Sequence, residues 1–167
     1  MNYLNMNEKK LTPVVVELNT LLAEYNVYYQ KLRNFHWNIQ GKAFFDLHNQ
    51  FEEMYSDARL KIDEIAERIL TLNFRPLSRM KEYLDISKIE ESPNALSDNE
   101  MVSMILNDHR MLLKQMKIVI NHASNAEDEG TIDLLGAYIR ELEKASWMLS
   151  AWMKKEYKEV EIRVLQN

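Results

Sequence analysis

Residues 43–72 have the apolar spacing of one long amphipathic helix. Their apolar side chains recur every three or four residues, so they fall on one stripe when each residue is turned by about 100° around the helix axis. The members of this stripe are Phe51, Met54, Tyr55, Ala58, Ile62, Ile65 and Ile69. A stripe of this length has to be buried against other elements, and it favours a helical bundle.

Four side chains that can bind metals lie beside this stripe rather than on it. Relative to His48, the stripe is centred near about −70° and Glu52 falls near about 40°. By the same arithmetic Asp63 falls near about 60° and Glu67 near about 100°. His48 and Glu52 are one turn apart and can bind one ion together, and Asp63 and Glu67 form a second such pair.

The two pairs cannot share an ion within one helix. Their nearest members are 11 residues apart, which is about 16 Å along a helix, whereas metal–ligand bonds are only about 2 Å long. A two-fold dimer removes the difficulty, because the His pair of one subunit could face the acidic pair of the other.

A second interpretation gives these side chains no special role. Acids beside an apolar stripe are usually solvated, and the same helix carries further acids that need no function. A single His at an apolar boundary is more often packed and hydrogen-bonded than bound to a metal. Spacing alone therefore leaves both interpretations open.

The rest of the chain supplies three more long helices and one long connection. Thr12 and Pro13 predict the start of the first helix, which runs to about residue 37 and carries His36 at its end. Because Gly41 lies in a short loop, the next helix should return antiparallel and bring His48 toward His36. Residues 73–96 form the long connection, with a short amphipathic helix expected at 78–84.

The third long helix is expected to begin at a capping box at residues 97–100, and the fourth after a polar turn at 125–130. Four helices with one long middle crossover predict an all-α, ferritin-like four-helix bundle with a short extra helix in the crossover. We expect a single domain over residues 1–167, with flexible tails at 1–10 and 158–167.

Composition excludes several other classes of protein. Three Gly and three Pro leave few turns for an all-β fold, and the chain has no Cys for a disulfide or a thiolate metal site. No apolar stretch approaches the roughly 20 residues of a membrane span, and residues 1–10 lack the apolar region of a signal peptide. We therefore expect a cytoplasmic protein without a membrane partner, with association with the nucleoid as the alternative location.

Several distinct motifs follow one another along the chain: N-F-H-W at 34–37, the turn at Gly41, F-x-x-L-H-x-x-F-E-x-x-Y at 44–55 and D-E-x-A-E-R at 63–68. Together they resemble the signature of the Dps family, the miniferritins named DNA-binding proteins from starved cells. P-L-x-x-M-K-E-Y-L at 76–84 and E-K-x-x-W-M at 143–148 are similar as well, so the resemblance covers residues 10–155. The family pattern has Asp or Glu at the position of Glu52.

The resemblance implies a ferroxidase site shared between two subunits. Its metal ligands would be His36, His48 and Glu52 from one subunit with Asp63 and Glu67 from the two-fold mate. The implied activity is oxidation of Fe(II), by hydrogen peroxide in preference to oxygen, with ferric iron stored in a hollow twelve-subunit shell that protects against oxidative stress.

The residues that precede the histidines argue against an iron site inside the bundle. Ordinary ferritin-like di-iron centres use Glu-x-x-His pairs, and none of the four histidines is preceded by Glu at this spacing. Imidazoles with carboxylates suit Fe(II), and also Zn or Mn.

Trp37 and an acidic cluster each have two interpretations. Trp37 could intercept radical equivalents near the iron, or it could simply pack at a subunit contact. The family uses acidic three-fold pores for iron entry, and the candidates here are Glu127, Asp128, Glu129 and Asp133. Acids at a helix start are also favoured by the helix dipole by about 0.3–1 kcal/mol, which is a sufficient structural reason for them.

The rival function is a DNA-compacting nucleoid protein with little or no ferroxidase activity. Family members that bind DNA often use tails rich in Lys and Arg. Here Lys9 and Lys10 are offset by Glu8, the C-terminal tail is nearly balanced, and the net charge is −5. We therefore expect weak DNA binding or none.

Overall fold

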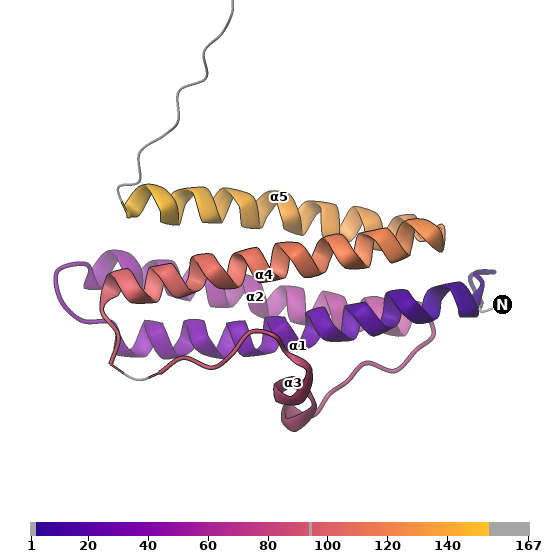
Figure 1. Cartoon of the computed structure of the whole chain (residues 1–167), viewed down its shortest axis with the longest axis horizontal. Coiled ribbons are helices and arrows are strands. Elements are labelled where there is room, and N and C mark those ends of the chain that lie inside the picture. Colours follow the sequence, from indigo (N-terminus) through magenta and orange to yellow (C-terminus); the bar gives the residue numbers. More distant parts are fainter. Residues whose placement is uncertain (1–2, 94, 154–167) are drawn as a thin grey trace, which may run out of the picture.

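Every regular element in residues 3–93 and 95–153, which the computed structural model describes, is a helix. The helices are α1 (Glu8–Asn38), α2 (Phe44–Thr71), α3 (Met80–Ile86), α4 (Asp98–Asn125) and α5 (Glu129–Trp152). The four long helices lie side by side, and the short α3 packs beside α1 in the crossover from α2 to α4 (Figure 1). The predicted all-α bundle with an extra crossover helix is confirmed. Within the described residues, no helix is both long enough and apolar enough to cross a bilayer.

The apolar stripe of α2 forms part of the bundle core. Phe51, Ala58, Ile65 and Ile69 are fully buried, and α2 packs mainly against α1. Since one side of α2 is turned inward by these contacts, the side chains on its opposite flank reach the surface.

The first helix begins earlier than the sequence predicted. Its N-cap is Asn7, whose side chain accepts a hydrogen bond from the backbone N–H of Lys9. Thr12 lies inside the helix and donates its hydroxyl to the Glu8 carbonyl, so its expected role as the cap is wrong. Leu11 is fully buried, and the helix continues past Pro13 although proline has no backbone N–H to donate.

The start of α4 agrees with its sequence signal, whereas α3 (Met80–Ile86) begins and ends two residues later than the expected 78–84. Ser97 caps α4 by accepting from the Glu100 N–H, and the Glu100 carboxylate accepts from the Ser97 N–H in return. The expected N-terminal tail is shorter than predicted, because residues 8–10 are helical. The expected tail at 158–167 lies outside the described residues.

Candidate metal centre

The turn at Gly41 brings two imidazoles face to face. Gly41 has φ +97°, a left-handed conformation that favours glycine, and it reverses the chain between the end of α1 and the start of α2. His36 lies in the last turn of α1 and His48 in the first turns of α2. Their rings stack with centroids 3.8 Å apart and planes 22° apart.

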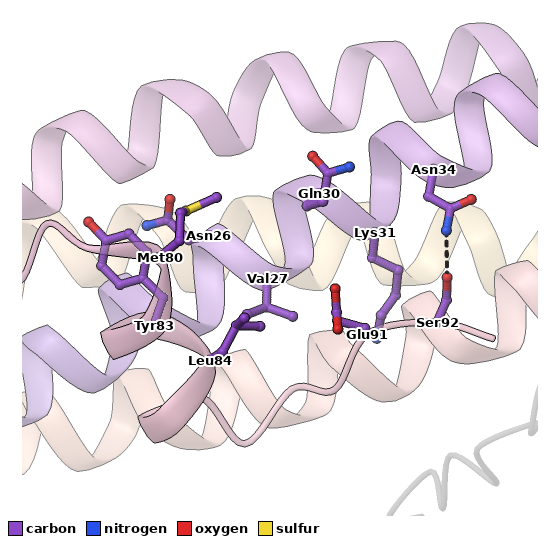
Figure 2. A pocket seen from close by; sticks show the side chains of 10 residues that line it. All are labelled: Asn26, Val27, Gln30, Lys31, Asn34, Met80, Tyr83, Leu84, Glu91 and Ser92. Atoms are coloured by element: carbon purple, nitrogen blue, oxygen red, sulfur yellow. Dashed lines mark hydrogen bonds between the residues drawn. The ribbon is translucent and has the colours of Figure 1, made fainter. Parts of the chain in front are cut away.

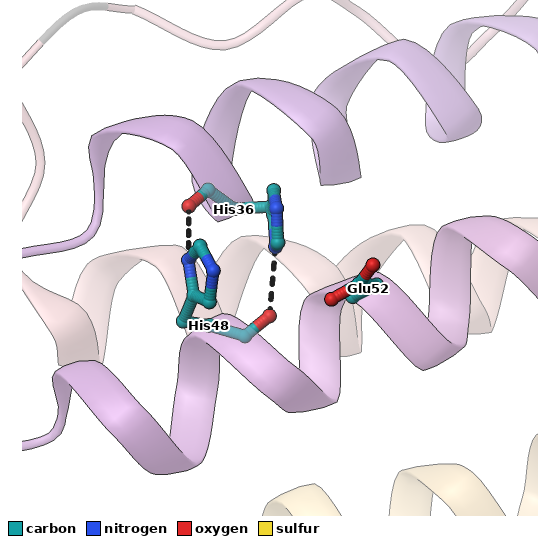
Figure 3. A group of neighbouring side chains, drawn as sticks. All are labelled: His36, His48 and Glu52. Carbon is teal, nitrogen blue, oxygen red and sulfur yellow. Dashed lines mark hydrogen bonds between the residues drawn. The ribbon is translucent and has the colours of Figure 1, made fainter.

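Reciprocal hydrogen bonds fix the orientation of both rings. The Nδ1 atom of His36 lies 2.8 Å from the His48 carbonyl oxygen, and the Nδ1 atom of His48 lies 2.8 Å from the His36 carbonyl oxygen (Figure 3). A carbonyl oxygen can only accept, so each Nδ1 carries the hydrogen. In a neutral imidazole with this tautomer, the lone pair that binds a metal is on Nε2.

Two aromatic residues pack around the pair. Phe44 stacks on His48 with centroids 4.8 Å apart, and Tyr55 meets His36 edge-on at 5.4 Å. Sequence reasoning missed these positioning residues, although Phe44 precedes His48 by one helical turn. That spacing was the available signal.

Glu52 completes a group of three ligands. His36, His48 and Glu52 each offer a ligand atom, and these atoms all lie within 4.8 Å of one another. His36 is 9% exposed, whereas Glu52 is exposed. The Glu52 carboxylate accepts a hydrogen bond of 3.4 Å from the Tyr55 hydroxyl. No other group of three such ligands exists among the described residues. Two imidazoles and one carboxylate leave coordination positions open on Fe(II), Zn or Mn.

Asp63 and Glu67 do not join this group. Both are exposed on the surface of α2, further along the helix. The structure therefore assembles three of the five predicted ligands and leaves the other two as a separate acidic pair. Within one chain, Asp63 and Glu67 therefore stay outside the group of three ligands.

Trp37 lies at the surface beside the pair of imidazoles. Its side chain is 58% exposed, and the Arg33 guanidinium stacks over its ring at 4.7 Å. An exposed indole next to His36 is compatible with both of its interpretations, and its role as a radical trap stays a prediction.

The proposed pore acids do not form one cluster. Asp128 is fully buried, caps α5 through the Thr131 N–H, and forms an ion pair with Arg68. Its charge is neutralised inside the protein, so it should be removed from the set of pore residues. Glu127 pairs with Lys10 at 3.3 Å at the surface, and Glu129 and Asp133 are exposed.

A separate cavity of about 320 Å³ lies between α1, α3 and the crossover (Figure 2). Asn34 donates a 2.9 Å hydrogen bond to Ser92 on its wall. Lys31 also lines the cavity. Its ammonium group forms a buried ion pair with Asp108, in which the Nζ–Oδ2 distance is 2.7 Å. Since these groups satisfy one another, the cavity is a weaker candidate for chemistry than the imidazole pair.

Comparison with known proteins places these features in a family. Residues 15–157 match the ferritin-like domain family. DNA protection during starvation protein 2 of Bacillus anthracis is 44% identical over 142 residues, which cover 85% of this chain and 97% of that protein. The DNA protection during starvation protein of Porphyromonas gingivalis is 39% identical over 150 residues, which cover 90% of this chain and 94% of that protein.

Solved structures agree with the sequence relatives. The crystal structure of the Dps protein of Vibrio cholerae O1, a member of a broad superfamily of ferritin-like diiron-carboxylate proteins, superposes with a TM-score of 0.89 at 42% identity and covers 92% of this chain and 96% of its own. The Dps protein of Bacillus brevis gives 0.86 at 40% identity and covers 89% of this chain and 99% of its own. With its bundle, its crossover helix and its paired histidines, the chain belongs to the Dps family of ferritin-like proteins.

Proposed function

We propose that this protein is a miniferritin that oxidises Fe(II) at sites shared between two-fold related subunits and stores the ferric product in a hollow twelve-subunit shell. The observation that carries the proposal is the divided ligand set. His36, His48 and Glu52 converge on one point, whereas Asp63 and Glu67 are exposed on the same helix at a distance that no single ion can span. A second copy of the chain supplies what the first half of the site lacks.

The ligand chemistry supports iron as the substrate. Neutral imidazoles bind Fe(II), and the carboxylates stabilise the higher charge of Fe(III) as it forms. Two Fe(II) ions give one electron each to hydrogen peroxide, whose O–O bond breaks with uptake of two protons to yield two water molecules. Because both electrons are delivered together, no hydroxyl radical has to be released. Oxygen is the alternative oxidant, and the cytoplasm is the proposed location.

The test is complementation between two inactive variants. One variant loses the imidazole side (His48→Ala with Glu52→Ala) and the other loses the acidic side (Asp63→Ala with Glu67→Ala). Each variant alone should be inactive, because both sites of its dimer lack ligands. In a mixed dimer, one site combines the two damaged halves and the other combines the two intact halves.

Co-refolding the two variants should therefore restore Fe(II) oxidation. Random pairing makes half of the dimers mixed, each with one working site, so we expect about a quarter of the wild-type rate. Each variant refolded with itself is the matched control. Activity that stays at background in verified mixed assemblies would refute the shared site, since a site within one chain is damaged in every subunit.

DNA compaction is the less favoured alternative. The named relatives are DNA protection proteins, but this chain carries a net charge of −5. Lys10, one of the few cations near the N-terminus, is held in α1 and pairs with Glu127. A gel-shift titration over a range of salt concentrations should give little binding at physiological ionic strength. A shell that shifts DNA there but does not oxidise iron would reverse this ranking.

A further inference from the structure

Three large apolar side chains are exposed on one face of α2. Phe45 is 77% exposed, Leu60 53% and Leu70 55%. By helical geometry they fall within about 80° of the helix circumference together with three of the carboxylates. Those carboxylates are Glu52, Asp63 and Glu67. These apolar side chains are far apart along the helix, so their exposure alone does not identify a partner surface. The spacing of the ligands provides the further argument.

The positions of the ligands define how two α2 helices would pair. In an antiparallel pair about a two-fold axis, opposing residues lie at equal distances from the axis. If His48 faces Glu67 of the second copy, the axis passes between residues 57 and 58. If Glu52 faces Asp63 of the second copy, the axis passes through the same point. Both ligand pairs therefore require one register.

The same register also pairs two exposed apolar residues. Phe45 and Leu70 were not used to locate the axis, yet they too are centred between residues 57 and 58. The most exposed apolar residue at the start of α2 would thus meet an exposed leucine near the end of the second α2.

We propose that Phe45 of one subunit and Leu70 of the partner subunit form an apolar clasp at each end of an antiparallel α2 pair, and that this clasp sets the register of the shared site. The occupant of the face is a second copy of this chain. The inference deepens the proposed function, on which its catalytic meaning rests.

The clasp has a direct connection to the imidazoles. The Phe45 ring meets the Phe44 ring edge-on at 5.3 Å, and Phe44 stacks on His48. Covering Phe45 restricts Phe44, and Phe44 in turn restricts His48. Phe45 and Leu70 are positioning residues, because neither touches the metal.

The clasp also offsets repulsion between carboxylates across the helix pair. The same register places Glu52 opposite Asp63 of the second copy, and two carboxylates repel each other until a cation lies between them. Apolar contact at both ends of the helix pair holds the dimer together before Fe(II) binds.

Cysteine cross-linking tests the register without iron. The chain has no native Cys, so Phe45→Cys and Leu70→Cys can be made as two separate proteins, mixed by refolding in chelator and oxidised. In this register, identical cysteines of two copies are about 37 Å apart, so neither protein forms a disulfide with itself. The mixture should give a disulfide-linked dimer.

Phe45→Cys mixed with Asp63→Cys is the matched control. Asp63 lies on the same exposed face but seven residues from the proposed partner position, about 10 Å along the helix and beyond disulfide reach. Cross-linking of the 45/70 mixture alone supports the clasp. Cross-linking of the 45/63 mixture, of both mixtures equally, or of neither would overturn it. The complementation result does not depend on this outcome, so failure of the register and failure of the shared site are distinguishable.

Kinetics test the positioning role separately. Phe45→Ala should raise the KM for Fe(II) by about tenfold with a smaller effect on kcat, since it loosens ligand geometry without removing a ligand. Phe45→Leu should restore most of the affinity. Val16→Ala, at an exposed apolar position on α1, is the control and should match wild type. A KM for Phe45→Ala within twofold of wild type would overturn the positioning role.

Discussion

Glu24, in the middle of α1, is a carboxyl group that water does not reach. Its side chain is 1% exposed, so its carboxyl group is removed from bulk water. Burial raises the pKa of Glu24 to about 7, while the charge of the Lys88 ammonium and a hydrogen bond from the Lys88 backbone act in the opposite direction. Because an unfolded chain releases this proton at much lower pH, folding and protonation are linked at this residue.

Replacing Glu24 with Gln should stabilise the fold more at alkaline pH than at acidic pH. The folded-state pKa is raised from 4.5 to about 7, so the stability from proton binding is fully present below pH 4.5 and is lost as pH rises through 7. The advantage of Glu24→Gln over wild type should grow by about 3 kcal/mol between pH 4.5 and 8. Urea unfolding at fixed subunit concentration measures it, with the exposed Glu90→Gln as control. A difference that does not vary with pH would contradict the linkage.

The buried ion pair between Lys31 and Asp108 leads to a second prediction at this scale. Their side chains are 2% and 4% exposed, and the Nζ–Oδ2 distance is 2.7 Å. Lys31→Met should cost about 3–5 kcal/mol in unfolding free energy, because it leaves the Asp108 carboxylate buried without its cation. Adding Asp108→Leu should recover most of that loss. The same urea titration checks both variants, and an equal loss in the single and double variants would show that packing dominates.

At the scale of the helices, a short sequence pattern predicts a helix start correctly where a side chain accepts a hydrogen bond from a backbone N–H at that start. The Ser97–Glu100 capping box was predicted from four residues and is confirmed. The start of α1 was not, because the Thr12–Pro13 signal competes with a second cap at Asn7 and with burial of Leu11. Tertiary packing decides between two plausible helix starts, and a sequence pattern does not weigh it.

The start of α5 carries the prediction about iron entry. Neutralising Glu127, Glu129 and Asp133 to Gln, Gln and Asn should slow growth of the ferric core, because an acidic channel concentrates Fe(II) and the effect should be largest at low salt. Asp128 is kept, since its ion pair with Arg68 anchors the turn. Core growth can be followed by absorbance after the initial oxidation step.

Asp85, Glu90 and Glu91, neutralised together, are the control for net charge, because they are exposed on the crossover side of the molecule. Iron uptake at low salt that is equal in the two triple variants would leave the α5 acids as residues that only stabilise a helix start.

At the scale of the whole molecule, the sequence predicted the part of the candidate site that lies within one chain, which is the group of His36, His48 and Glu52. The sequence placed His48 and Glu52 one turn apart, and the Gly41 turn brought His36 to them as expected. The reciprocal hydrogen bonds of the imidazoles and the Phe44 stack could not be predicted, because they depend on the relative rotation of two helices. The acidic pair stays apart in a single chain for the same geometric reason that motivates a dimer.

The last prediction concerns assembly beyond that dimer. A two-fold contact closes on itself and stops at two subunits, so a hollow shell needs a second interface elsewhere. Trp147 and Met148 offer an apolar surface near the end of α5, with exposures of 54% and 48%. With chains of 19.9 kDa, sedimentation at micromolar concentration should give a particle of about 240 kDa. Trp147→Glu with Met148→Glu should shift it to about 40 kDa, because a buried charge blocks the second contact and leaves the α2 pair intact. That dimer should still oxidise Fe(II) but should precipitate ferric iron instead of retaining it. A wild-type monomer or isolated dimer would refute the shell, and a full-size particle from the double variant would place its second interface away from α5.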